Sequence, residues 1–143
     1  MFRGEHTHNI DAKGRIFFPV KFREELGDRF YITKGLDGCL FVFPSKEWEE
    51  LEAKLSAIPI TNQNGRKIAR MLQGGAFEAE VDSQGRVLIP QGLREHGDIK
   101  KEIVTMGVGR RIEIWGKERL QIYQGSPDDT NSEAAEALAE FGV

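Results

Sequence analysis

Residues 11–19, DAKGRIFFP, and residues 82–90, DSQGRVLIP, are two versions of one stretch, and their agreement indicates how the chain is organised. The copies lie 71 positions apart, and this offset gives 11 identities over the 45 aligned positions from 4 to 48. Two copies are too few for a repeat array. We therefore expect two half-folds that share one core. The identities are Gly4/Gly75, Asp11/Asp82, Gly14/Gly85, Arg15/Arg86, Pro19/Pro90, Arg23/Arg94, Glu24/Glu95, Ile32/Ile103, Gly38/Gly109, Lys46/Lys117 and Glu47/Glu118.

Each copy predicts the same order of elements. An alternating, strand-like run ends at the Asp, and a short apolar run after the Arg is stopped by proline, which cannot donate to a strand ladder. A short amphipathic helix with proline at its start follows, and then two strands joined by a glycine-containing turn. The expected strands are 5–11, 15–19, 30–35, 39–44, 76–82, 86–90, 102–108 and 111–116, and the expected short helices are 21–26 and 91–97.

Two helices are expected between the copies. Ser45 has the residue type of an N-cap for the first helix, and Pro59 ends it. Thr61 or Asn62 caps a second helix that ends near Gly74. Apolar residues at helical spacing face inward, namely Trp48, Leu51, Leu55, Ile68 and Leu72. The outer face of the second helix carries Arg66, Lys67 and Arg70, which serve either as phosphate contacts or as an ordinary solvated face.

Charge is divided unevenly along the chain of 143 residues. Residues 120–143 hold five acidic and no basic residues, so the other 119 residues carry 20 Lys and Arg against 23 − 5 = 18 acidic residues. An acidic tail thus follows a mildly basic body, and the overall charge of −3 does not exclude an anionic partner. No apolar run approaches the roughly 18 residues of a membrane span, and the N-terminus lacks a signal-peptide core. We expect a cytosolic protein.

The spacing D-x-x-G-R has a local physical explanation. The Asp can accept backbone N–H bonds in the turn, the Gly supplies a positive φ, and the Arg then leaves a stiff bend. One interpretation is that Asp and Arg only pair to hold the turn. The other is that two matching turns present Arg15 and Arg86 to an extended anion, since Arg donates bidentate bonds to phosphate or to guanine O6 and N7. The duplication favours the second interpretation for the arginines and a turn-structuring role for Asp11, Gly14, Asp82 and Gly85.

The motif D-x-x-G-R-[IV]-x-[IF]-P, present twice, resembles the MraZ family, whose halves are similar to the AbrB-type swapped-hairpin DNA-binding domain. The resemblance runs from Met1 to about Tyr123. It implies a mostly β (α+β) fold, a double-split swapped-hairpin β-barrel made of two AbrB-like repeats with a helical hairpin insert. It also implies a ring oligomer and a transcriptional regulator, generally a repressor, that recognises short G-rich direct repeats upstream of the division and cell-wall gene cluster, including its own promoter.

These observations lead to specific expectations. The domains are repeat 1 (5–47), the helical insert (48–75), repeat 2 (76–119) and the acidic tail (120–143). The partners are double-stranded DNA and other copies of the chain, with no membrane, small-molecule substrate or cofactor, and the protein is nucleoid-associated. The DNA-binding residues are Arg15, Arg86, Lys13 and Arg3. The alternative function is a ring-forming scaffold that grips a partner protein. The tail is either inert or competes with DNA for the basic face.

Other chemistry is weakly supported by the sequence. His6 and His8 alternate on one strand, but no further ligand has metal-site spacing, so no metal site is expected. Cys39 lies in an apolar run and is expected to be a buried thiol. No catalytic motif is present, and the protein is not expected to be an enzyme. The apolar residues Phe41, Phe43 and Trp115 belong either to the core or to contacts between subunits.

Overall fold

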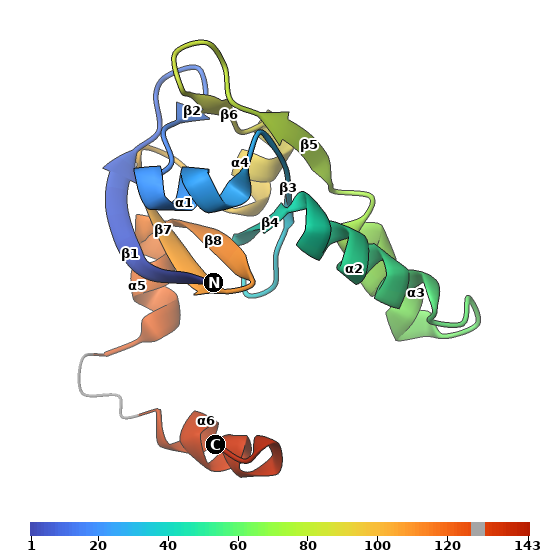
Figure 1. Ribbon diagram of the computed structural model, residues 1–143. Coiled ribbons are helices and arrows are strands. Elements are labelled where there is room, and N and C mark those ends of the chain that lie inside the picture. Colours follow the sequence, from blue (N-terminus) through green and yellow to red (C-terminus); the bar gives the residue numbers. More distant parts are fainter. Residues whose placement is uncertain (127–130) are drawn as a thin grey trace.

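The computed structural model describes residues 1–126 and 131–143, and a six-stranded antiparallel sheet forms its centre (Figure 1). The strand order in this sheet is β1-β7-β8-β4-β3-β5. A separate two-stranded antiparallel ribbon pairs β2 with β6. The strands are β1 (Phe2–Asn9), β2 (Arg15–Ile16), β3 (Arg29–Lys34), β4 (Leu40–Pro44), β5 (Phe77–Glu80), β6 (Val87–Leu88), β7 (Glu102–Gly109) and β8 (Arg111–Gly116).

Helices follow the strands at the same points of both copies. The short helices α1 and α4 begin directly after Pro19 and Pro90, as the sequence predicts, and α2 and α5 begin directly after β4 and β8. Figure 1 shows α2 and α3 projecting from one end of the sheet, away from the β2–β6 ribbon. The helices are α1 (Val20–Leu26), α2 (Ser45–Ser56), α3 (Gln63–Leu72), α4 (Gln91–His96), α5 (Lys117–Gln124) and α6 (Ser132–Ala137), and a 3-10 turn covers Leu138–Phe141.

The two halves of the chain are interleaved rather than side by side. The strand order is symmetric about the central β4–β8 pair, because β1 of the first half pairs with β7 of the second, and β5 of the second half pairs with β3 of the first. The predicted pair of half-folds sharing one core is confirmed. β1 and β5 are the edges of this sheet, and no pairing joins them among the described strands.

The register shows that the offset of 71 does not continue through the second part of each copy. Phe30 pairs with Pro44 in the first hairpin, and Ile103 pairs with Gly116 in the second, so β3 and β7 correspond at 73 positions and β4 and β8 at 72. Residues 27–28 separate α1 from β3, whereas residues 97–101 separate α4 from β7, and the hairpin turn of the second copy is shorter. The identity Ile32/Ile103 is therefore not a structural equivalence. The offset of 71 does not align the strands of the second part of each copy, because the connecting segments differ in length while the strand pairing is kept.

Apolar side chains fill both faces of the sheet. One cluster includes Phe30, Leu40 and Ile112 and extends under the ribbon through Ile16 and Val87. The other cluster joins the opposite face to α2, α3 and α5, and its buried members are Cys39, Phe41, Phe43, Trp48, Leu55, Leu72, Val104, Trp115 and Leu120. Phe41, Phe43 and Trp115 thus belong to the core of the single chain.

Several local predictions are tested by the helix ends. Asn62 caps α3, since its Oδ1 accepts a 2.8 Å bond from the Gly65 N–H. The prediction that Ser45 caps α2 is wrong: Pro44 holds the N-cap position, and the Ser45 hydroxyl donates instead to the Arg29 carbonyl at 3.0 Å. Tertiary contact with β3 has replaced the local cap.

The acidic tail contains the short helix α6. Residues 127–130 of the predicted acidic tail (120–143) lie outside the described residues. None of the helices in the described ranges combines the length and apolarity that crossing a bilayer requires.

Candidate nucleic-acid interface

The first D-x-x-G-R turn is closed by a single carboxylate. Asp11 Oδ1 accepts the backbone N–H groups of Lys13 and Arg15, each at 2.9 Å, and Oδ2 accepts the Arg15 Nε–H at 2.8 Å. Backbone bonds from Gly14 N to Asp11 O and from Asp11 N to Arg15 O complete the turn. The Asp therefore both shapes the backbone and holds the Arg side chain by its Nε edge.

The second turn repeats this bonding group by group. Asp82 Oδ1 accepts the N–H groups of Gln84 and Arg86, each at 2.8 Å, and Oδ2 accepts the Arg86 Nε–H at 3.0 Å. The turn glycines have nearly equal positive φ angles, 84° at Gly14 and 82° at Gly85, which L side chains resist. The identical residues of the repeat therefore build identical geometry.

Both guanidinium groups remain within reach of solvent. The side chain of Arg15 is 26% exposed and that of Arg86 is 22% exposed, and each ion pair with the preceding Asp lies at the surface. The pKa of Asp11 and of Asp82 is lowered, first by the backbone N–H bond from the respective Arg and further by that guanidinium. The carboxylates stay ionised at neutral pH, so each Arg is held in one orientation while its two amino groups lie away from the Nε bond.

A second pair of arginines crosses between the halves of the chain. A Cβ placed on Gly14 would lie 2.8 Å from the guanidinium carbon of Arg94, whose Nε donates to the Ile89 carbonyl at 2.9 Å. A Cβ on Gly85 would lie 2.8 Å from Nη1 of Arg23. Sequence reasoning assigned these two arginines no role at the site, although their identity in both copies was a usable signal. They pack against the turns of the opposite half.

The β2–β6 ribbon joins the two turns and has one apolar and one mixed face. Ile16 and Val87 are buried, whereas Phe17 is 55% exposed and Leu88 is 47% exposed. Arg15 pairs with Leu88 across the ribbon, so the arginines and these exposed apolar residues alternate on the outward face. The sequence analysis predicted no role at the site for Phe17 and Leu88, because both lie in short apolar runs that predict ordinary strands.

The other basic residues proposed from sequence lie in different places. Lys13 is exposed at the tip of the first turn, next to Arg15. Arg3 pairs with Val108 near the start of β1, so six residues of strand, roughly 20 Å, separate it from the end of β1 at Asn9. The structure therefore brings Lys13, Arg15 and Arg86 together but not Arg3. On α3, Arg66 bonds the Ile60 carbonyl at 3.1 Å within the helical hairpin.

Histidine and cysteine side chains serve structural roles in the described chain. His8 bonds Thr105 Oγ1 at 3.0 Å, and burial lowers its pKa, with a smaller effect from His6. Burial raises the pKa of Cys39 to about 12, so the predicted buried thiol is confirmed and a thiolate is disfavoured. In the ranges that the structure describes, no three His, Cys, Asp or Glu residues are grouped as metal ligands.

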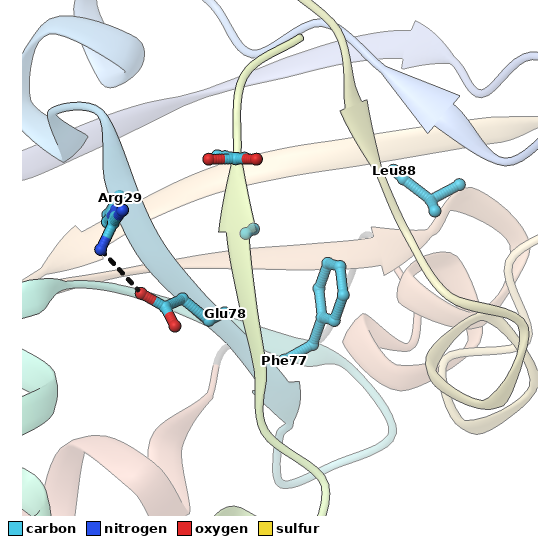
Figure 2. A pocket seen from close by; sticks show the side chains of 6 residues that line it. Arg29, Phe77, Glu78 and Leu88 are labelled. Atoms are coloured by element: carbon cyan, nitrogen blue, oxygen red, sulfur yellow. Dashed lines mark ion pairs between the residues drawn. The ribbon is translucent and has the colours of Figure 1, made fainter.

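A pocket of about 470 Å³ lies between the β5 edge and the ribbon (Figure 2). Phe77 and Leu88 lie on one side of β5 in this view, and Arg29 and Glu78 lie on the other. Arg29 Nη1 and Glu78 Oε1 form an exposed ion pair at 3.8 Å, so these charges face each other and not a free ligand. The pocket shows no convergent set of polar groups for a small molecule.

Comparison with known proteins places the whole chain in one family. The family model described as "MraZ protein, putative antitoxin-like" matches residues 1–71 and again residues 72–141. A protein of Clostridium acetobutylicum named "Transcriptional regulator MraZ" is 52% identical over 143 residues, with complete coverage of both chains. A protein of Carboxydothermus hydrogenoformans with the same name is 51% identical over 141 residues, or 99% of each chain, and one of Thermoanaerobacter pseudethanolicus is 49% identical over the full length of both.

Proposed function

Since this chain belongs to the MraZ family, we propose that it is a sequence-specific DNA-binding transcriptional regulator, acting mainly as a repressor at its own promoter. Its proposed operator consists of short G-rich direct repeats upstream of the division and cell-wall gene cluster. The observation that carries the proposal is the pair of matching turns that hold Arg15 and Arg86 at the two ends of one exposed ribbon. The protein would work in the cytoplasm at the nucleoid.

The geometry of the ribbon suits the major groove of B-DNA. This groove admits a two-stranded β-ribbon, and Arg is the side chain that most often reads guanine through O6 and N7. Asp11 and Asp82 occupy the Nε edges of the two guanidinium groups, so the amino groups can donate to a base edge. One interpretation of the motif gave the Asp–Arg bond a purely structural role. In this proposal the same bond also orients the Arg side chain toward a base edge.

Neighbouring residues complete the proposed contact surface. Lys13 at the turn tip contacts phosphate, and Arg3 contacts only phosphates outside the part of the groove that the ribbon occupies. Each subunit then contributes few charges. We propose that a ring of subunits compensates through multivalency, with neighbouring subunits related head-to-tail, as direct repeats require and palindromes do not.

The test measures binding of the full-length protein to the DNA upstream of its own gene, against a scrambled duplex, over a range of salt concentrations. Binding should prefer the native duplex and weaken steeply with salt, because counterions are released on contact. Arg15→Ala and Arg86→Ala should each weaken binding at least tenfold. Arg110→Ala is the matched control, because Arg110 is an exposed arginine in the β7–β8 turn and pairs only weakly with Glu50 at 4.0 Å.

Two outcomes would contradict the proposal. One is a folded Arg15→Ala, Arg86→Ala double variant that binds the native duplex as the wild type does. The other is equal, salt-insensitive binding to native and scrambled DNA by an intact oligomer, which would favour the scaffold function instead.

A further inference from the structure

Two large apolar side chains are exposed at matching places in the two halves. Phe17 and Leu88 are 71 positions apart, and each is about half exposed, while the residues on either side of them in the ribbon are almost fully buried. Much of the surface of a folded protein is apolar, so a single exposed apolar side chain needs no explanation. A symmetric pair beside the two symmetric arginines does need one.

The ribbon register sets each apolar residue beside an arginine of the other half. Arg15 stands opposite Leu88, and Ile16 opposite Val87. Continuing this antiparallel register by one residue sets Phe17 opposite Arg86. The Phe17 ring also lies 3.8 Å from the Cβ position of Gly85, at the base of the second turn. The outward face therefore presents two arginine–apolar pairs, one in each half, which share the approximate twofold symmetry of the strand order.

Among the described residues, none covers the exposed part of Leu88. Figure 2 shows Leu88 on the same side of β5 as Phe77, with which it lines the pocket. Even with this neighbour, Leu88 remains 47% exposed, about as much as Leu36, a loop residue at 49%. A partner that covers Leu88 would therefore come from outside the described chain.

That partner must accept guanidinium and apolar groups at the same place. A protein surface laid over this face would bury the guanidinium groups of Arg15 and Arg86, which costs free energy unless new acceptors replace water. The major groove supplies both needs, because guanine offers two acceptors and thymine offers a C5-methyl group that takes apolar contacts. Charge complementarity thus favours DNA over a second copy of the chain.

We propose that Phe17 and Leu88 are specificity-determining residues that contact thymine methyl groups beside the guanines read by Arg15 and Arg86. This inference rests on the proposed function. Residues two apart on a strand are separated by roughly 7 Å, and directly opposed residues by about 5 Å, which corresponds to one or two base-pair steps of roughly 3.4 Å. The contacted thymines therefore lie within two base pairs of the contacted guanines.

The experiment removes the methyl group alone, by replacing thymine with deoxyuridine in the native duplex. The wild-type protein should bind the fully substituted duplex about three- to tenfold more weakly, as expected for the loss of buried methyl groups. Substituting one thymine at a time should place the effect within two base pairs of the guanines at which 7-deazaguanine, which lacks the N7 acceptor, weakens binding.

Protein variants then show which side chains cause the difference in affinity between thymine and deoxyuridine duplexes. Leu88→Ala and Phe17→Ala should weaken binding to the thymine duplex and remove most of the difference between thymine and deoxyuridine. Leu36→Ala is the matched control, with the same residue type and nearly the same exposure in the β3–β4 connection, and it should preserve both affinity and discrimination. The oligomer mass, measured by light scattering, should be the same for all variants.

The outcomes separate this inference from the function on which it rests. Specific, salt-dependent binding that does not distinguish thymine from deoxyuridine overturns the inference and leaves the proposed function intact. A change of oligomer mass in Phe17→Ala or Leu88→Ala, with methyl discrimination retained, also overturns it and assigns the pair to a subunit contact. If the wild-type protein shows no preference for the native duplex over the scrambled duplex, both proposals are rejected.

Discussion

The guanidinium carbon of Arg94 lies so close over Gly14 that a Cβ on this glycine would approach it to 2.8 Å. Arg94 belongs to the second half of the chain and Gly14 to the turn of the first, and Arg23 stands over Gly85 in the converse relationship. Each turn is therefore shaped locally by its own Asp and supported by an arginine from the opposite half. The glycines are needed for two independent reasons, the positive φ angle and the close approach of the guanidinium group.

Replacing Gly14 with alanine should destabilise the protein. The φ angle of 84° costs an L residue about 1–2 kcal/mol, and the new methyl group must also displace Arg94. Gly92→Ala is the control, because Gly92 lies within α4 and has open space around its Cβ position. That change should leave the free energy of unfolding equal or up to about 1 kcal/mol higher. Urea unfolding compares them, and equal stability of the two variants would contradict this account of Gly14.

Asp11→Asn together with Asp82→Asn should weaken DNA binding more than it affects folding. An amide oxygen can still accept the backbone N–H groups, but the charged partner of each Arg Nε is lost. The arginines then sample more orientations, and affinity for the native duplex should fall several-fold with little change in melting temperature. Asp98→Asn serves as the control, since Asp98 pairs only loosely with Arg119 at 4.0 Å and Asn tolerates its positive φ. Wild-type affinity in the double variant would show that the ion pairs do not orient the arginines.

Thr33→Val should loosen the attachment of α3 to the sheet. The buried Thr33 hydroxyl donates to the Leu72 carbonyl at 2.6 Å, joining β3 to the last turn of α3. Valine has nearly the same shape but leaves that carbonyl unsatisfied, at a cost of about 1–3 kcal/mol. Hydrogen exchange should show faster opening of α3. Thr7→Val, at an exposed position of β1, should leave both stability and exchange in α3 unchanged.

Stability should decline in mildly acidic solution because of His8. Its pKa is lowered in the folded protein, mainly by burial, so the unfolded chain takes up the proton first. The contribution is complete above the ordinary histidine pKa of about 6.5 and is lost as the pH falls from there through the lower folded value. Unfolding measured at several pH values between 5 and 8 should show this slope in the wild type and a smaller one in His8→Gln. His6→Gln should keep most of the slope, since burial is the larger cause, and an unchanged slope in His8→Gln would assign it to another group.

Local sequence was enough to predict the turns and most of the elements. The Asp, Gly and Arg of each motif lie within five residues of one another, so their bonds depend on little beyond the turn itself. The prolines before α1 and α4 and the Asn62 cap are similarly local. Where a distant partner competed, as at Ser45 with the Arg29 carbonyl, the local rule was wrong.

Short-range patterns in the amino-acid order show that the chain is double, that each copy contains a stiff turn ending in arginine, and where helices begin after proline. The folded arrangement was needed to show that the halves interleave, that Arg94 and Arg23 each support the turn of the opposite half, and that Phe17 and Leu88 face outward beside Arg15 and Arg86. The difference arises from how far apart the interacting groups lie along the chain. A turn is set by groups a few residues apart, whereas contacts such as that between His8 and Thr105 join positions 97 residues apart, and they form only when the whole sheet does.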